Sequence, residues 1–194
     1  YSPAPVVTRD VHDRVMSDII LPTIAGMGAE GSAYVGFLYA GLMIDAEGMP
    51  RVLEFNCRMG DPETQPIMLR LRSSLVELCD AAVAGRLAGH DLQWDARVAL
   101  GVVLAAAGYP DDARKGDVIH GLEQDFGQDV KVFHGGTTLR GADTVTSGGR
   151  VLCVGALGAG VAEARQRAYS AVDRIHWPGM FCRRDIAHRA LARI

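Results

Sequence analysis

The segment 54–65 carries the side chains of this chain that are best suited to chemistry, and it reads EFNCRMGDPETQ. Because side chains alternate between the two faces of a strand, Glu54 and Asn56 are expected to point the same way. A carboxylate and an amide are hard oxygen ligands, and Arg58 follows them as a cation. This combination suits a magnesium ion that carries phosphates. The segment therefore predicts a site for a metal-bound nucleotide, as used in ATP-dependent ligation.

The same segment predicts how its strand packs and how it ends. Leu53, Phe55 and Cys57 should face the other side of the strand and enter apolar packing. Asp61 is followed by proline, a pattern in which the aspartate caps a helix and the proline takes the first helical position. A second proline, Pro66, allows the helix to begin a few residues later.

Two elements are predicted to position this segment: a helix and, after it in the sequence, an antiparallel hairpin. Thr8 is expected to cap the helix, and Pro22 to end or kink it. An apolar run with aromatic residues at 33–44 is typical of a buried strand. A turn follows at 45–48, and residues 51–57 form the second arm of the hairpin.

One long helix is predicted after the hairpin. Its apolar residues recur every three or four positions, at Ile67, Leu71, Leu75, Leu78 and Ala82. Gly85 or Gly89 is expected to end it. Upstream of the hairpin, the glycines at positions 26, 28 and 31 are expected to mark a loop.

The sequence pattern changes near residue 97, where frequent glycines begin to separate short apolar runs. Short apolar runs separated by glycines favour a β-rich segment. The predicted strands are 98–107, 130–133 and 150–156, and the predicted helices are 161–175 and 184–192. We therefore expect an α+β chain with two domains, residues 1–93 and residues 94–194.

Composition and charge narrow the function classes. The 194 residues include 20 Lys+Arg and 23 Asp+Glu, a formal net charge of −3, which gives no basic footprint for nucleic acid. No run approaches the roughly 18 apolar residues of a membrane helix. The four cysteines show no metal-site spacing and are interpreted as buried thiols; they are Cys57, Cys79, Cys153 and Cys182. With no leader peptide apparent, a reducing, cytoplasmic setting is expected.

The segment 54–65 and its flanks resemble the phosphoribosylamine–glycine ligases (glycinamide ribonucleotide synthetases), which are ATP-grasp enzymes of purine biosynthesis. The motif is far more restrictive than a short glycine pattern. The resemblance extends along the chain through YSPAPVVT at 1–8, GFLYAGLMI at 36–44, HGGT at 134–137, GGRVLCVGALG at 148–158 and RRDIAHRAL at 183–191. It covers the C-terminal portion of that family only. The family's N-terminal part and its phosphate-binding lysines are therefore expected to lie upstream of Tyr1, in a longer protein.

The resemblance implies an ATP-grasp antiparallel sheet with helices, followed by a small β-rich C-terminal domain, barrel-sandwich-like, with a helix. It implies that ATP, glycine and 5-phosphoribosylamine react to glycinamide ribonucleotide, ADP and phosphate through glycyl phosphate. Mg²⁺ or Mn²⁺ would be the cofactor. The expected partners are these substrates and the N-terminal part of the enzyme, with no nucleic acid and no membrane. The isolated chain is expected to be inactive.

The resemblance also implies roles for individual residues. Glu54 and Asn56 match the family's ligands for the metal and its nucleotide. Arg58 and Asp61 are candidate catalytic residues. Arg58 either stabilises the transferring phosphoryl group or forms an ion pair that shapes the turn. Asp61 either binds a substrate amine or only caps a helix.

Two alternative functions stay open at this point. The chain could belong to another ATP-grasp carboxylate–amine ligase, or it could be a non-catalytic fragment that acts as a binding or scaffold module. Many ATP-grasp enzymes carry an acid on the neighbouring strand, where this chain has Leu42 and Met43. That departure argues against other ATP-grasp families and leaves water and phosphates to complete the metal shell.

Overall fold

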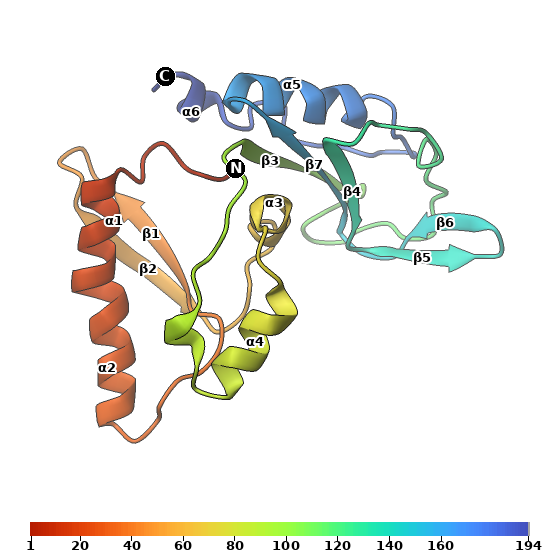
Figure 1. The fold of residues 1–194 in the computed structure, drawn as a ribbon. Coiled ribbons are helices and arrows are strands. Elements are labelled where there is room, and N and C mark those ends of the chain that lie inside the picture. The colour runs from red at the N-terminus through yellow and green to blue at the C-terminus, as the bar shows by residue number, and fades with distance from the viewer. Residues whose placement is uncertain (194) are drawn as a thin grey trace. The chain divides into compact units, whose positions relative to one another are not determined.

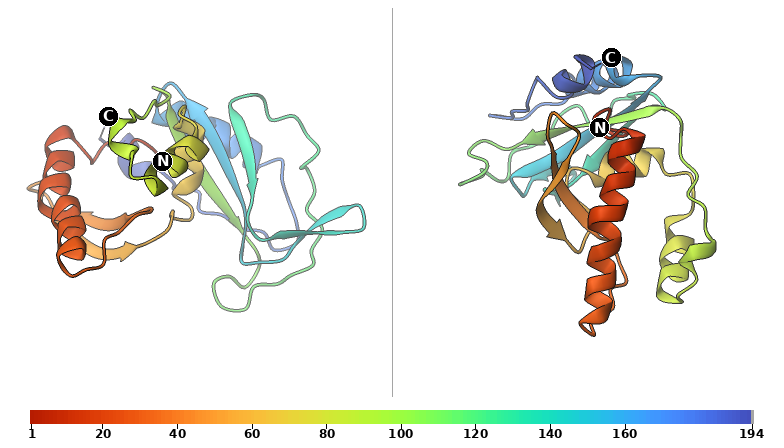
Figure 2. Two further views of the ribbon diagram at one scale, coloured as in Figure 1. Left: turned by 60° about the horizontal axis from the view of Figure 1, so that its bottom comes forward. Right: turned by 90° about the vertical axis from the view of Figure 1, so that its left-hand side faces the viewer.

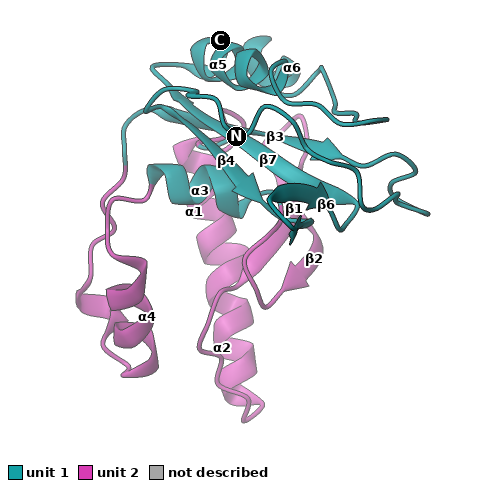
Figure 3. Ribbon diagram, turned by 90° about the vertical axis from the view of Figure 1, so that its right-hand side faces the viewer, with its two compact units in different colours: residues 1–2, 62–70, 95–194 teal, residues 3–61, 71–94 magenta. Residues whose placement is uncertain are grey.

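A computed structural model describes residues 1–193, which form two compact units (Figures 1 and 3). We call residues 3–61 and 71–94 the hairpin unit, drawn in magenta in Figure 3. Of the described residues, 1–2, 62–70 and 95–193 make up the three-stranded unit, drawn in teal. Each unit is described by itself.

The hairpin unit contains a long helical run, a two-stranded sheet and a further helix. Its elements are α1 (Arg9–Val15), a π-helical turn (Met16–Ile20), α2 (Leu21–Ala29), β1 (Tyr39–Ile44), β2 (Pro50–Asn56), α4 (Leu75–Val83) and a 3-10 turn (Leu87–Gly89). The helical run is the red and orange rod in both views of Figure 2. Thr8 caps it as predicted, because the Thr8 hydroxyl accepts a hydrogen bond of 3.3 Å from the backbone nitrogen of Val11.

Pro22 does not end this helical run, and the predicted loop begins later than expected. Pro22 lies in the first turn of α2, directly after the π-helical turn, and has no backbone N–H to donate. The change in hydrogen-bond spacing at this point allows the helix to continue past the proline. The Thr23 hydroxyl donates to the carbonyl oxygen of Ile19 at 2.7 Å across the same turn. The helix then continues, so Gly26 and Gly28 lie inside α2 rather than in a loop.

The predicted hairpin is confirmed, although its first strand is shorter and less buried than expected. β1 and β2 pair antiparallel, and the turn is held by Asp45, whose carboxylate accepts from the backbone nitrogen of Met49 at 2.8 Å. Residues 33–38 are irregular, and Phe37 is 44% exposed. The register shifts after Gly41, so that Leu53 is the extra residue of a bulge in β2.

The single long helix predicted after the hairpin is wrong, because two shorter helices take its place. The first, α3 (Thr64–Arg70), lies in the three-stranded unit, and α4 begins after Ser74. The Ser74 hydroxyl caps α4 by accepting from the backbone nitrogen of Glu77 at 3.3 Å. The Ser73 hydroxyl accepts from the backbone nitrogen of Gln93 at 2.8 Å. Ser74 thus satisfies a donor in the first turn of α4, and Ser73 satisfies one outside any helix, so both serines favour a break between α3 and α4.

The three-stranded unit is built around one antiparallel sheet with strand order β3-β7-β4. Its elements are α3, β3 (Val98–Ala105), β4 (Val130–His134), β5 (Thr137–Arg140), β6 (Asp143–Thr146), β7 (Arg150–Gly158), α5 (Val161–Val172) and α6 (His188–Leu191). The central strand β7 is buried along all but its first residue. Since β5 and β6 pair separately, the described residues form no closed barrel, and the predicted α+β class is confirmed.

Helices cover both faces of this sheet. On one face, Leu100, Val102 and Leu104 of β3 belong to a buried core that includes Ala164 and Ala168 of α5. On the other face, a Cβ added at Gly101 would lie 3.4 Å from Pro66 of α3. Figure 2 shows α5 and α3 on opposite sides of the strands. No helix within residues 1–193 combines the length and apolar character needed to cross a membrane.

The prediction that all four cysteines are buried is wrong for two of them. Cys57 and Cys79 are exposed, Cys153 is buried, and Cys182 is half-buried; all four thiols are free. Cys57 and Cys79 belong to the hairpin unit, whose small sheet and single helices bury few side chains completely. Burial raises the pKa of the Cys182 thiol above its usual value.

Tyr169 ties α5 to the segment that leads into α6, and its removal should lower stability. The Tyr169 hydroxyl donates to the carbonyl oxygen of Arg183 at 2.7 Å and accepts from the backbone nitrogen of Ile186 at 3.2 Å. Replacing Tyr169 by phenylalanine is expected to lower the free energy of unfolding by about 1 kcal/mol at neutral pH. Thermal unfolding of the two proteins measures the difference.

The same substitution should change the alkaline limit of stability. Burial raises the pKa of Tyr169 above its usual value. The folded protein therefore holds this proton more tightly than the unfolded chain does. The resulting stability is fully present below about pH 10, the pKa of an unperturbed tyrosine, and is lost as the pH rises through the raised pKa. Tyr169→Phe should flatten that alkaline loss, and equal pH profiles for both proteins would contradict the assignment.

Candidate functional site

Glu54 and Asn56 lie side by side at the end of β2. The Asn56 amide nitrogen Nδ2 donates a hydrogen bond of 3.0 Å to Oε1 of Glu54. Both side chains therefore point to the same side of the strand, as alternation predicts. Glu54 is exposed and Asn56 is half-buried. Two oxygen-bearing side chains thus face solvent together at the end of the hairpin.

Arg58 extends this pair into a chain of three hydrogen-bonded residues. It occupies the bend that follows β2. One guanidinium nitrogen donates to Oδ1 of Asn56 at 3.4 Å, and the other donates to the carbonyl oxygen of Met59 at 3.1 Å. Both polar atoms of the Asn56 amide are therefore hydrogen-bonded, the nitrogen to Glu54 and the oxygen to Arg58.

Asp61 is exposed in a turn formed by residues 61–63. The following helix begins at Thr64, so Asp61 does not occupy the position directly before the first helical residue. The later start is the one that Pro66 allows. Of the four residues predicted from the sequence, Glu54, Asn56 and Arg58 are thus joined by hydrogen bonds, and Asp61 follows in the next turn.

The prediction that the opposite face of β2 enters apolar packing is wrong in this structure. Leu53 is 65% exposed and Phe55 is 43% exposed, and Cys57 is exposed as well. Burial of a strand face needs a second layer, and the hairpin unit leaves these side chains uncovered. The alternation of faces is a local property and holds, whereas burial is not local and does not follow from it.

The neighbouring strand offers no acid to the candidate ligands. Gly41 is paired with Glu54, and Tyr39 is paired with Asn56. Across residues 1–193, no group of three or more His, Cys, Asp and Glu side chains has a geometry that could hold a metal ion. Any cation beside Glu54 would therefore take most of its ligands from elsewhere.

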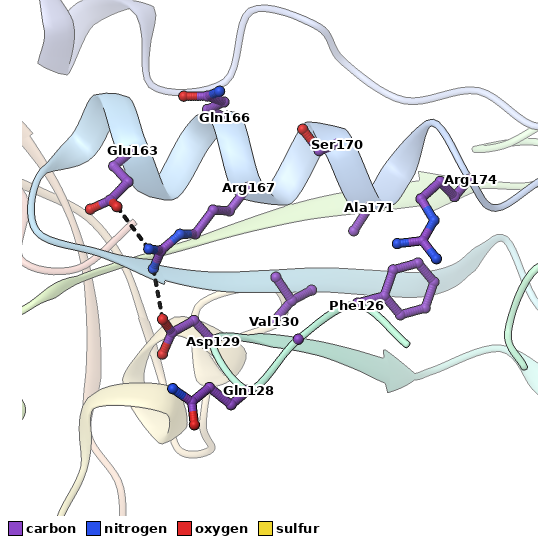
Figure 4. A pocket seen from close by; sticks show the side chains of 11 residues that line it. Phe126, Gln128, Asp129, Val130, Glu163, Gln166, Arg167, Ser170, Ala171 and Arg174 are labelled. Carbon is purple, nitrogen blue, oxygen red and sulfur yellow. Dashed lines mark hydrogen bonds and ion pairs between the residues drawn. The ribbon is translucent and has the colours of Figure 1, made fainter. Parts of the chain in front are cut away.

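Sequence reasoning did not identify two cavities. One, of about 560 Å³, lies in the three-stranded unit between α5 and the segment before β4 (Figure 4). Both arginines that line it have partners. Arg167 forms ion pairs with Asp129 at 2.8 Å and with Glu163 at 2.7 Å. The Arg174 guanidinium lies 4.8 Å from the centre of the Phe126 ring. Arg167 is therefore neutralised by acids, whereas Arg174 donates to the side-chain oxygen of Gln124 and the carbonyl oxygen of Asp125 and keeps its charge.

The other cavity is apolar and lies in the hairpin unit. It has a volume of about 520 Å³, and α4 contributes Leu75, Leu78 and Ala82 to its lining. These are three residues of the apolar stripe predicted for the long helix. The stripe was therefore recognisable from its spacing, whereas the open space beside it also depends on residues 87–92, which follow α4, and on residues 35–37, which are distant in sequence.

Solved structures define the class of protein. The chain superimposes on the biotin carboxylase domain of 2-oxoglutarate carboxylase from Hydrogenobacter thermophilus with a TM-score of 0.63 at 13% identity, covering 93% of this chain and 39% of that one. The biotin carboxylase subunit of pyruvate carboxylase gives a TM-score of 0.62 at 16% identity, covering 93% of this chain and 39% of that one. These likenesses show that the chain shares its fold with part of these carboxylases, and the match of residues 1–64 to an ATP-grasp (A) domain names that fold.

Sequence comparisons then define the family. Residues 1–64 match the ATP-grasp (A) domain of phosphoribosylglycinamide synthetase, and residues 99–189 match the C domain of the same family. The crystal structure of phosphoribosylamine–glycine ligase from Thermotoga maritima is 34% identical, with a TM-score of 0.75 over 93% of this chain and 43% of that one. The chain therefore corresponds to a C-terminal portion of the phosphoribosylamine–glycine ligase family.

Relatives confirm this correspondence over the whole chain. Phosphoribosylamine–glycine ligase from Vibrio cholerae is 64% identical over 193 residues, which are 100% of this chain and 45% of that protein. The ligase of the same name from Escherichia coli strain K12 is 61% identical over 194 residues, again 45% of its length. The chain thus spans about half the length of the relatives it matches.

Proposed function

We propose that this chain supplies the metal-binding strand of an ATP-dependent ligase that joins glycine to 5-phosphoribosylamine. The observation that carries the proposal is the adjacent pair Glu54 and Asn56 at the end of β2, 3.0 Å apart and facing solvent. It lies within a chain that is similar throughout to proteins named phosphoribosylamine–glycine ligase. The reducing, cytoplasmic setting predicted from the sequence belongs to the same proposal.

The donor set fits a magnesium or manganese ion. Oxygen ligands at about 2.0–2.1 Å from Mg²⁺ in an octahedron are roughly 2.9 Å apart. The Asn56 amide now places its nitrogen 3.0 Å from Glu54 Oε1. Half a turn of the amide plane would place its oxygen there instead, at the spacing that neighbouring ligands adopt. Water and phosphate oxygens would complete the shell, because the paired residues of β1 are Gly41 and Tyr39.

The turn of the amide would also release Arg58. In the structure, the guanidinium donates to Oδ1 of Asn56 at 3.4 Å. After the amide rotates, its N–H groups face the guanidinium, and two donors repel each other. Arg58 then has reason to leave Asn56 and to bind phosphate oxygens, where a bidentate cation is favourable. Asp61, exposed in the next turn, is proposed to bind a substrate amine.

The reaction proposed has two steps. A carboxylate oxygen of glycine attacks the γ-phosphorus of ATP, and the bond from that phosphorus to the β–γ bridging oxygen breaks, releasing ADP and forming glycyl phosphate. The amine nitrogen of 5-phosphoribosylamine then attacks the glycyl carbonyl carbon. A C–N bond forms, the C–O bond to phosphate breaks, and inorganic phosphate and a proton leave. A bound divalent cation would neutralise negative charge on the phosphates during phosphoryl transfer.

The experiment uses the complete ligase, which we define as this chain joined to the N-terminal portion of its 64%-identical relative from Vibrio cholerae. We expect ADP release that requires glycine together with a nitrogen nucleophile, which 5-phosphoribosylamine supplies in the complete reaction. With ATP, glycine and hydroxylamine alone, we expect glycine hydroxamate, because hydroxylamine traps an acyl phosphate. Ligation without a trapped hydroxamate would contradict the intermediate, and an absence of glycine-dependent ADP release would contradict the function.

The 194-residue chain alone is expected to release no ADP in the same assay. The hairpin unit, residues 3–61 and 71–94, contains no lysine and supplies Arg58 as the cation beside the proposed ligands. A triphosphate needs several positive charges to be held for phosphoryl transfer. Turnover by the chain alone would show that its own arginines suffice.

A further inference from the structure

Gly41 lies directly before the register shift at the Leu53 bulge, and its own backbone conformation does not require a glycine. It lies inside β1, and its φ angle is outside the left-handed region that favours this residue. A glycine within a strand lowers stability relative to residues with a side chain. Glycine in a strand often marks a bulge or a place where another group approaches closely, and Gly41 has both a bulge opposite it and a closely approaching group. At Gly41, that group is the side chain of Glu54.

The Glu54 side chain lies across the space above Gly41. The two residues are paired between β1 and β2. A Cβ added at Gly41 would lie 3.0 Å from Cγ of Glu54 and 3.7 Å from its carboxylate oxygen Oε1. The first of these distances is shorter than ordinary van der Waals contact between carbon atoms. Because Cγ is the second carbon of the side chain, a Cβ at position 41 requires it to shift by a few tenths of an ångström, and the carboxylate that it carries shifts as well.

We propose that Gly41 is a positioning residue, whose missing side chain allows the Glu54 carboxylate to lie beside Asn56. The inference rests on the proposed function in one respect, namely that Glu54 is a metal ligand. The hydrogen bond of 3.0 Å between Asn56 and Glu54 exists only while the carboxylate keeps its present place. A methyl group at position 41 is expected to shift Glu54 and to disturb its pairing with Asn56.

A positioning role and a structural role make opposite predictions for stability. Alanine or valine at position 41 should favour the strand, because both have higher strand propensity than glycine. The thermal unfolding temperature of the complete ligase should therefore stay the same or rise. Its affinity for Mn²⁺ in the presence of ADP, measured by electron paramagnetic resonance, should nevertheless fall by about tenfold for Gly41→Ala. Gly41→Val should cause a larger loss, since its branched Cβ fills more of the space.

The matched control is Gly26→Ala. It adds the same methyl group to the same unit, inside α2, where an added Cβ meets nothing within 4 Å. This variant should bind Mn²⁺ with the affinity of the unmodified ligase. The probe is Mn²⁺ with ADP and needs no turnover.

Glu54→Gln in the same titration separates the inference from the function on which it rests. If Glu54→Gln weakens Mn²⁺ binding and both Gly41 variants do not, the positioning role is overturned and the metal site stands. If Glu54→Gln leaves Mn²⁺ binding unchanged, the metal assignment itself fails. If the Gly41 variants lose stability and Mn²⁺ affinity in parallel, Gly41 has a structural role and the inference is overturned.

Discussion

Replacing Glu54 by glutamine in the complete ligase is expected to lower kcat by about 100- to 1,000-fold. Glutamine keeps the length and planar shape of the side chain, and it can still hydrogen-bond to Asn56. It removes the negative charge and one of the two anionic oxygens that would hold a divalent cation. The loss should therefore appear in metal-dependent steps, with a raised magnesium requirement accompanying the lower rate.

The folded structure should not respond to this substitution. Glu54 is exposed, and its described partner is the amide of Asn56, which can also donate to a glutamine carbonyl. Steady-state kinetics over a range of magnesium concentrations, together with thermal unfolding, distinguishes the two effects. Glu47→Gln is the matched control, because Glu47 is an exposed carboxylate in the turn of the same hairpin. Kinetics for Glu54→Gln equal to those of the control would remove the metal site from the proposal.

Replacing Gly158 by alanine is expected to lower the free energy of unfolding of the chain by about 3 kcal/mol. Gly158 is the last residue of β7 and is buried against the first turn of α5. An added Cβ would overlap the backbone nitrogen of Ala164 and lie 2.9 Å from its Cα. Backbone atoms cannot rotate away as the end of a side chain can, so β7 and α5 must separate, and the core between them loses contacts.

Gly160→Ala tests whether the effect belongs to this close approach rather than to the loss of a glycine. Gly160 precedes α5 by one position, has an extended φ of −149°, and an added Cβ there meets nothing within 4 Å. Gly160 is the N-cap of α5, where alanine is less favourable than glycine, so its replacement should cost about 1 kcal/mol, clearly less than that of Gly158. Denaturant unfolding of both variants measures the difference, and equal stabilities for the two would disprove the steric explanation.

The parts of the structure that the sequence predicted well are those decided by neighbouring residues. The hairpin with its Asp45 turn, the Thr8 cap and the shared face of Glu54 and Asn56 follow from alternation and local hydrogen bonding. The end of α4 near Gly85 also follows, since Gly85 has a φ of +69° directly after the C-cap.

The parts that the sequence did not predict depend on residues far apart along the chain. The helix breaks before Ser74 because residues 71–73 pair with residues 93–94, which no local pattern shows. The exposure of Leu53 and Phe55 depends on whether another layer covers that face of β2. The contact between Gly41 and Glu54 required the strand register, including the bulge at Leu53.

The exposed thiol of Cys57 makes the candidate site addressable by chemical labelling. Cys57 lies between Asn56 and Arg58 in the chain, whereas Cys153 is buried and the pKa of Cys182 is raised. Maleimide reagents react with accessible thiolates, so they should modify Cys57 and Cys79 before the other two. With Cys79 replaced by serine, a fluorophore on Cys57 would report nucleotide and metal binding from the residue next to Asn56, on the opposite face of the strand, without any engineered cysteine.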